Sequence, residues 1–298
     1  MKFLSPNRAV IALFTAMFTL ILFSCKKENS TANDISNESP SEEETAVYAD
    51  ESVQAAASFD DVEDIGMIAA GEEATVSAES GRGFPFTELR LRLGICAKID
   101  VTPNDSTYPK TITIDFGDGC ICADGKFRKG AIILHLTGPL RKPGSVVTIT
   151  LREFYLNRAH IEGTKIISNL SENGNIKFTV QVVGGKLTLP NGRGYSVESL
   201  KHVRQTAGGA TRIVLDDVFA IEGRYGIQFN NGVKITLNTE TPLVKKVICP
   251  WISDGLLKIK INDRTLFLAY GAPNNGACDN KGLLTWNNGN NHRLITLP

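Results

Sequence analysis

From about residue 84 to the C-terminus, the chain is a series of short runs rich in Val, Ile, Thr and aromatic residues, separated by Gly, Asn and Asp. Examples are TITIDFG, AIILHLTG, SVVTITLREFYL and YGIQFNNGVKITLN. Runs bounded in this way predict strands, and Asn-Gly in the last example favours a hairpin because it supplies the positive φ of a type I′ turn. Roughly 210 residues of this pattern can form one all-β domain. We therefore expect residues 84–298 to form antiparallel sheets built of hairpins, in a sandwich-like or elongated arrangement.

Two segments of this region resemble each other. Residues 148–166 and 212–227 both read as a strand, an aromatic residue, Ile-Glu-Gly and a second strand, which places Glu162 and Glu222 alike. A second similarity joins TITIDFGDGCICADGKFRKGAIIL to LFLAYGAPNNGACDNKGLLTW. Repeated hairpin units would explain both similarities, and chance similarity among hairpins is the alternative.

The N-terminus has the features of an export signal. Lys2 and Arg8 precede an uninterrupted apolar run, which is short for a membrane span and is followed by Leu22-Phe23-Ser24-Cys25. This predicts a cleaved signal peptide over residues 1–24, and the last four residues resemble the lipobox of bacterial lipoproteins. We expect Cys25 to carry the lipid, and two or more acyl chains give stable anchoring. Phe23 is bulkier than the usual residue at its position.

Between the lipid site and the strands, the sequence predicts a tether and a helix. Residues 25–50 are polar, acidic and nearly free of large apolar groups, so they predict a flexible tether. Over residues 51–83, apolar residues recur every three positions from Val53 to Ile68, which predicts one short amphipathic helix and a linker. Asp50 or Ser52 could cap its start, and Gly71 could end it.

Charge is divided unevenly along the chain. Residues 26–80 hold 15 acidic and 2 basic residues, a balance of −13. Residues 81–298 hold 17 acidic and 28 basic residues, a balance of +11. Such asymmetry bears on partners and not on fold. The acidic segment could cover the basic one, the basic one could meet an anionic glycan or lipid, or the charge could serve solubility alone.

The lipobox, TITIDFGDGC with DGKFRKGAI after it, the Ile-Glu-Gly pairs and the late AYG…GACDNKG together resemble a family of lipoproteins common in the Bacteroidota. The resemblance covers most of the region from Cys96 to the end. It implies a family and an outer-membrane location, and it implies no catalytic residues, because no activity is established for that family.

Five cysteines remain once Cys25 is set aside, and an exported chain permits disulfides. Cys249 and Cys278 could close one loop. Residues i and i+2 on a strand face the same side, so only one of Cys120 and Cys122 can easily pair with Cys96. At least one thiol stays free or pairs with another chain.

The loop after TITIDF invites several interpretations. Asp115-Phe116-Gly117 matches the kinase DFG, but the Gly-rich loop, the strand lysine and the HRD loop that work with it are missing. Asp115, Asp118 and Asp124 could serve calcium, although the spacing is not that of an EF-hand. A single C-x-C is a weak zinc signal. A turn explains the glycines and aspartates better, and we predict no metal site or cofactor.

Motifs for hydrolysis are sparse. The sequence has no G-x-S-x-G and no H-E-x-x-H. A glycosidase needs only two carboxylates across a cleft, which Glu162, Glu222, Asp216 and Asp217 could supply. Asp105-Ser106-Thr107 resembles an O-glycosylation signal of Bacteroidota, which makes Ser106 a candidate acceptor.

The sequence thus predicts an envelope lipoprotein of the outer membrane, on its periplasmic or cell-surface face. The expected role is a non-catalytic binding or structural module rather than an enzyme. The expected partners are the membrane, a glycan that is anionic, or an envelope protein, and not nucleic acid, since the cations are dispersed among few stacking aromatic residues. The alternative is a carbohydrate-active hydrolase that uses paired carboxylates.

Overall fold

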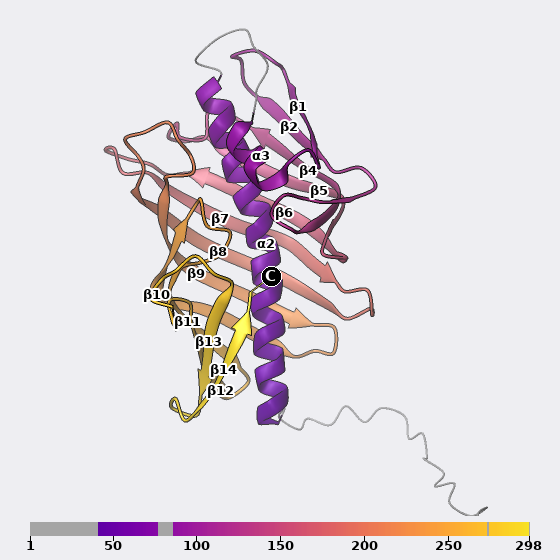
Figure 1. The fold of residues 1–298 in the computed structure, drawn as a ribbon, viewed down its shortest axis with the longest axis vertical. Coiled ribbons are helices and arrows are strands. Elements are labelled where there is room, and N and C mark those ends of the chain that lie inside the picture. The colour runs from indigo at the N-terminus through magenta and orange to yellow at the C-terminus, as the bar shows by residue number, and fades with distance from the viewer. Residues whose placement is uncertain (1–40, 77–85, 273, 298) are drawn as a thin grey trace, which may run out of the picture. The chain divides into compact units, whose positions relative to one another are not determined.

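The computed structural model describes residues 41–76, 86–272 and 274–297 (Figure 1). The predicted signal peptide, Cys25 and the first part of the tether lie outside the described residues. Within those ranges the chain forms two helices, α2 (Glu42–Val76) and α3 (Thr87–Leu93), and fourteen strands. The predicted all-β class with one N-terminal helix is confirmed.

The strands form one antiparallel sheet in which neighbours along the chain are neighbours in space, except that β3 pairs only with β4, beside β2. Their bounds are β1 Lys98–Thr102, β2 Lys110–Asp115, β3 Cys120–Ile121, β4 Phe127–Leu136, β5 Val146–Leu156, β6 Ala159–Asn169, β7 Lys177–Thr188, β8 Gly194–Ala207, β9 Val218–Phe229, β10 Lys234–Lys246, β11 Asp254–Ile261, β12 Arg264–Ala269, β13 Lys281–Trp286 and β14 Asn291–Thr296. Buried and exposed residues alternate along most strands, as in β8, so the sheet has an inner and an outer face.

Helix α2 is longer than the sequence pattern predicts. It begins at Glu42, so residues 42–50 are helical and not part of the tether, and it continues past Gly71 to Val76. Its start is a capping box: the Ser41 backbone N–H donates to the Glu44 carboxylate (2.8 Å), and the Glu44 N–H donates to Ser41 Oγ (3.3 Å). The cap is therefore Ser41, and Asp50 and Ser52 lie inside the helix.

The apolar stripe predicted for the helix is confirmed. Val53, Phe59, Ile65 and Ile68 are all buried. The helix lies against the inner face, with β1–β5 on one side of it and β10–β14 on the other (Figure 1), and it contacts β4, β5, β8 and β11. Because the sheet curves around it, the helix is enclosed on more sides than an amphipathic helix on a flat sheet.

Local details differ from the sequence predictions in three places. The Asn-Asn-Gly turn does join β9 to β10, but only Gly232 has a positive φ (+90°), so the turn is not type I′. Residues 148–166 form a hairpin of β5 and β6. The matching residues 212–227 form a loop followed by the single strand β9, so this similarity is not a repeated hairpin. Helix α3 was not predicted; the Glu72 carboxylate of α2 accepts its first N–H groups, from Glu88 and Leu89.

Candidate functional site

The most unusual part of the molecule is a group of four carboxylates near the middle of α2. Asp60, Asp61, Glu63 and Asp64 belong to one and a half turns, and each helical residue is rotated by about 100° from the one before it. Asp60, Glu63 and Asp64 therefore share one face of the helix, and Asp61 points about 100° away from Asp60. Each of the four carboxylates meets at least one cation from the surrounding structure, so this part of the helix is paired with opposite charge.

Cations on five strands of the sheet supply this charge. They all point to the inner face, are all buried, and all pair with a carboxylate of α2: Lys110 on β2, Arg128 on β4, Lys165 on β6, Lys201 on β8 and Lys245 on β10. Buried charges are costly unless they are paired and hydrogen-bonded. We call these five residues the inner cations. Because each is buried and paired, the inner cations and the acidic helix depend on each other.

The Asp61–Arg128 contact is the most completely paired. The Arg128 guanidinium donates from Nη2 to both Asp61 carboxylate oxygens (2.8 and 2.9 Å) and from Nε to one of them (3.2 Å). Asp124 accepts from Arg128 on the other side (2.7 Å), and Lys126 reaches Asp61 at 3.0 Å. Burial alone would raise the pKa of Asp61, but Arg128 and Lys126 outweigh it and lower that pKa to about 2.

A second cluster lies between β6, β8 and β9. Lys201 pairs with both Asp60 (2.7 Å) and Glu63, Lys165 donates to Glu63 (2.8 Å), and the Tyr225 hydroxyl donates to Asp60. Burial lowers the pKa of Lys165. Burial alone would raise the pKa of Asp60. The charges of Lys201 and Lys165 outweigh burial and lower that pKa. Burial and the Asp60 charge raise the pKa of Tyr225, which stays a hydrogen-bond donor.

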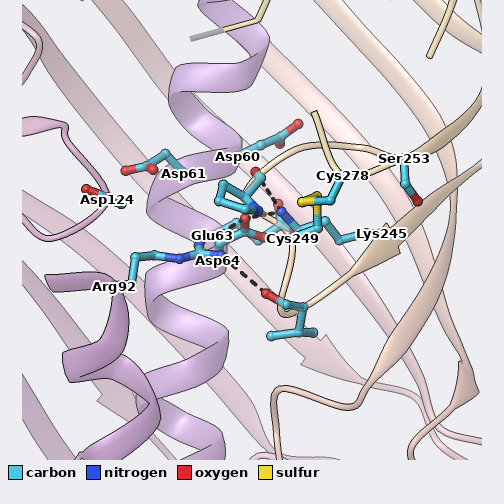
Figure 2. Close-up of polar contacts among 12 residues, drawn as sticks. Asp60, Asp61, Glu63, Asp64, Arg92, Asp124, Lys245, Cys249, Ser253 and Cys278 are labelled. Atoms are coloured by element: carbon cyan, nitrogen blue, oxygen red, sulfur yellow. Dashed lines mark hydrogen bonds and ion pairs between the residues drawn. A yellow bond between two sulfur atoms is a disulfide. The ribbon is translucent and has the colours of Figure 1, made fainter. Parts of the chain in front are cut away.

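Asp64 connects the helix to α3 and to β10 with the loop that follows it. Figure 2 shows Lys245 and Arg92 on Asp64, with Lys245 also donating to the Pro250 carbonyl (2.9 Å) and Arg92 to that of Val247 (3.3 Å). The Cys249–Cys278 disulfide lies just beyond these carbonyls (Figure 2). The disulfide thus fixes the loop whose carbonyls hold the two cations.

A small cavity adjoins these clusters. Its volume is about 70 Å³, and Asp60, Lys201, Tyr225, Trp251 and Tyr270 are among the residues that line it. One water molecule needs roughly 10–15 Å³ of such space, so this cavity is large enough for a few waters. The carboxylates around it are held by ammonium or guanidinium groups, which suits them to fixing the helix rather than to proton transfer.

The carboxylates proposed for glycoside hydrolysis do not form a pair. Glu162 on β6 and Glu222 on β9 are both exposed on the outer face. The strand register places Glu162 across from Lys186, then Ser196, then Gln228, which is six residues from Glu222. Three strand spacings and six residues correspond to roughly 25 Å, whereas glycosidase carboxylates lie about 5–9.5 Å apart.

The remaining acids of that proposal have structural contacts. Asp217 is buried and accepts from Arg141 at 2.6 Å and from the Gln205 side chain at 2.6 Å. Asp216 lies beside it and accepts from the Thr211 hydroxyl at 2.8 Å. These contacts fix the loop before β9, so the pair explains how that loop is held and not how a substrate would react.

The predicted disulfides are present. Cys249 pairs with Cys278, and of the two alternatives for Cys96 the structure has Cys120. Cys122 is a free thiol and is buried. The loop before β3 is a turn, as expected: the Asp115 carboxylate accepts from the Gly117 N–H (2.8 Å) and pairs with Arg152, and Gly117 has a positive φ.

The candidate glycosylation residue and a hollow lie on the outer surface. Ser106 is exposed in the loop between β1 and β2, so a glycan attached to its hydroxyl would not disturb the packing of the core. A hollow of about 220 Å³ lies over β7, β8 and β9, lined by Lys177, His202 and Arg204 together with Leu170 and Glu222. We call it the basic hollow, because cations outnumber the single carboxylate there.

The inner cations are the site residues that were not predicted from the sequence. Their signal is present, since Lys201 alternates with the buried Val197 and Val203, and Lys245 with the buried Leu243 and Val247. A cation in the apolar phase of a strand predicts a buried partner. That partner is a helix more than a hundred residues away in the sequence in both cases.

Comparison with protein families, with curated proteins and with solved structures found no match. Neither of the described helices is long and apolar enough to cross a membrane.

Proposed function

We propose that this chain is a non-catalytic binding or structural module of the cell envelope, held in the outer membrane by lipid on Cys25. The proposal of a non-catalytic role rests on one observation. The carboxylates of α2 that face the sheet are paired with the inner cations. General acid–base catalysis needs a group free to exchange a proton with a substrate. The exposed outer face is where a partner would bind.

The lipid anchor rests on the sequence alone, and fractionation tests it. The full chain with Cys25→Ala should move from the membrane fraction to the soluble fraction of the bacterial envelope, whereas Ser24→Ala, which keeps a small residue before the cysteine, should remain with the membrane. Retention of the Cys25→Ala protein in membranes would exclude the anchor.

For the ligand, we propose an anionic glycan bound at the basic hollow. Lys177 and Arg204 are exposed around it, together with His202, and exposed cations such as lysine and arginine recognise carboxylated or sulfated chains through charge that salt can screen. The open hollow is much larger than the internal cavity, and residues of β7, β8 and β9 line it. A chain that lies across strands can therefore contact several cations at once.

Calorimetric titration with polygalacturonate, with uncharged dextran as the control ligand, tests this site. Lys177→Glu with Arg204→Glu should weaken binding by about tenfold or more. Lys234→Glu with Lys260→Glu makes the same change in net charge at exposed residues elsewhere on the sheet and should have a much smaller effect. Equal losses in the two variants would show attraction to net charge only, and the basic hollow would be rejected.

A further inference from the structure

Three cysteine sulfurs gather where β3 meets the start of β1. Cys96 and Cys120 form a disulfide, with their Cα atoms 5.8 Å apart, and the Cys122 thiol is free. The three Sγ atoms all lie within 4.8 Å of one another. A free thiol therefore lies beside a disulfide, which is the arrangement that thiol–disulfide exchange requires.

The local backbone brings these groups together. Cys120 and Cys122 are separated by Ile121, whose side chain is 74% exposed and points away from them. Residues i and i+2 of extended chain face the same side, so both sulfurs face Cys96. Cys122 is buried, whereas Cys96 and Cys120 are half-buried, so the free thiol is the least accessible of the three.

The surroundings of Cys122 connect it to the inner cations. The Arg128 guanidinium lies beside its sulfur and is itself held by Asp61 and Asp124. Burial raises the pKa of the Cys122 thiol, and Arg128 opposes that rise. The thiolate is therefore a minor species at neutral pH, and it forms next to a fixed positive charge.

We propose that the three cysteines form a thiol–disulfide exchange centre, in which the disulfide moves between Cys96–Cys120 and Cys96–Cys122. The Cys122 thiol loses its proton, and the thiolate attacks Cys96 Sγ. The Cys122–Cys96 bond forms as the Cys96–Cys120 bond breaks, and Cys120 leaves as a thiolate that takes up a proton. One disulfide and one thiol are present before and after, so no oxidant or reductant is consumed.

Attack on Cys96 is favoured over attack on Cys120 by the geometry of the chain. In extended backbone, the Cα atoms of residues i and i+2 lie about 6.6–6.8 Å apart, at the upper limit of what a disulfide spans. A Cys120–Cys122 bond would thus need a bend at Ile121. The product of attack on Cys96 needs none, and it exchanges a buried free thiol for the half-buried Cys120 thiol.

The exchange has a consequence at the surface. In the first form the free thiol is enclosed beside Arg128, and in the second form it is on Cys120, where reagents and partner thiols can reach it. The proposal is independent of the function proposed above, because it depends only on the three cysteines and their surroundings.

Disulfide mapping of Cys120→Ser in the full chain tests the proposal. Cys96 and Cys122 should form a disulfide in the folded variant, seen by mass spectrometry as a link between tryptic peptides 93–98 and 111–126. The matched control is Cys278→Ser, in which Cys249 should stay a free thiol because neither Cys96 nor Cys122 lies beside it. Free Cys96 and Cys122 in a folded Cys120→Ser protein would overturn the proposal, and circular dichroism establishes the fold.

A second measurement uses the wild-type chain and does not depend on the variant's stability. Native protein is incubated with iodoacetamide, digested, and fragmented to distinguish Cys120 from Cys122. We expect carbamidomethyl on Cys120 together with a Cys96–Cys122 link, at a rate that rises by about tenfold per pH unit between neutral pH and the thiol pKa. Label confined to Cys122, or no label on either cysteine, would overturn the proposal.

Discussion

At the scale of single residues, Asp61 is subject to two opposing effects. Its carboxylate is 3% exposed, so water stabilises its charge poorly, yet Arg128 and Lys126 lie within hydrogen-bonding distance. Burial alone would raise its pKa, but the two cations outweigh burial and hold the pKa at about 2. Since the unfolded value is about 3.9, the ionised carboxylate contributes stability that is present above pH 4 and lost as the pH falls toward 2.

We therefore predict that Asp61→Asn lowers the free energy of unfolding by about 3–5 kcal/mol at pH 7, because Arg128 loses a buried partner. The difference from wild type should shrink by about 2 kcal/mol between pH 5 and pH 2, where the wild-type carboxylate is neutralised too. Urea unfolding followed by tryptophan fluorescence measures both. The exposed Glu43→Gln should change stability by less than about 0.5 kcal/mol. A difference that does not vary with pH would show that the charge of Asp61 is not what stabilises the fold.

At the scale of elements, the pairing of β4 with β5 depends on one glycine. The register shifts between Lys129 and Ala131, and Gly130 in between has a φ of +81°. A Cβ at this position would lie 2.0 Å from the Glu153 carbonyl oxygen. The neighbouring atoms are backbone and cannot rotate away, so the bulge requires glycine.

We predict that Gly130→Ala costs more than about 3 kcal/mol, from the positive φ and the backbone overlap together. Gly226 on β9 is the matched control, because a Cβ there meets nothing within 4 Å. Gly226→Ala should raise stability by about 0.5–1 kcal/mol, since glycine inside a strand carries an entropic cost. Thermal and urea unfolding measure both changes. Similar effects at the two positions would show that glycine's missing side chain, and not the bulge, decides the outcome.

The elements themselves were largely predictable, and their limits were not. Strand runs between turn residues, the apolar stripe of α2 and the disulfide of Cys249 with Cys278 could all be predicted from the sequence, because each depends on local pattern or on cysteine number. The start of α2 could not be predicted from apolar residues, because Ser41 and Glu44 fix it by hydrogen bonds within a polar segment. The Ser-x-x-Glu spacing was the available signal.

The buried charges were the hardest part to predict. Acidic residues in a helix ordinarily indicate a solvated face, and in the middle of α2 they are held against the sheet by buried cations. Pairs such as Asp61 with Arg128 join residues far apart in the sequence, so their partners follow only from the topology. The pairing of Glu162 with Glu222 was wrong for the same reason: their matching sequence context says nothing about the distance between two strands that are not neighbours.

At the scale of the whole molecule, the uneven distribution of charge along the chain is explained in part by pairing within the fold. Helix α2 has eleven acidic residues and no basic one, and the inner cations bind its central carboxylates. Removing the helix would take away the carboxylates that pair with these cations and would expose the apolar inner face. The helix is thus part of the core rather than a separable cover of a preformed groove.

This predicts how the molecule opens, which native-state hydrogen exchange measures. Amides near Phe59, Ile65 and Ile68 should exchange with a free energy within about 1 kcal/mol of that of global unfolding, because releasing the helix breaks both the ion pairs and the apolar core. Amides in the Asn-Asn-Gly turn between β9 and β10 should exchange by local motion at much lower free energy. If the amides of α2 exchanged together several kcal/mol below the central strands, the helix would detach as a unit. The sheet would then keep its fold with the inner cations exposed to solvent, and the inner face would have to be considered as a second binding surface.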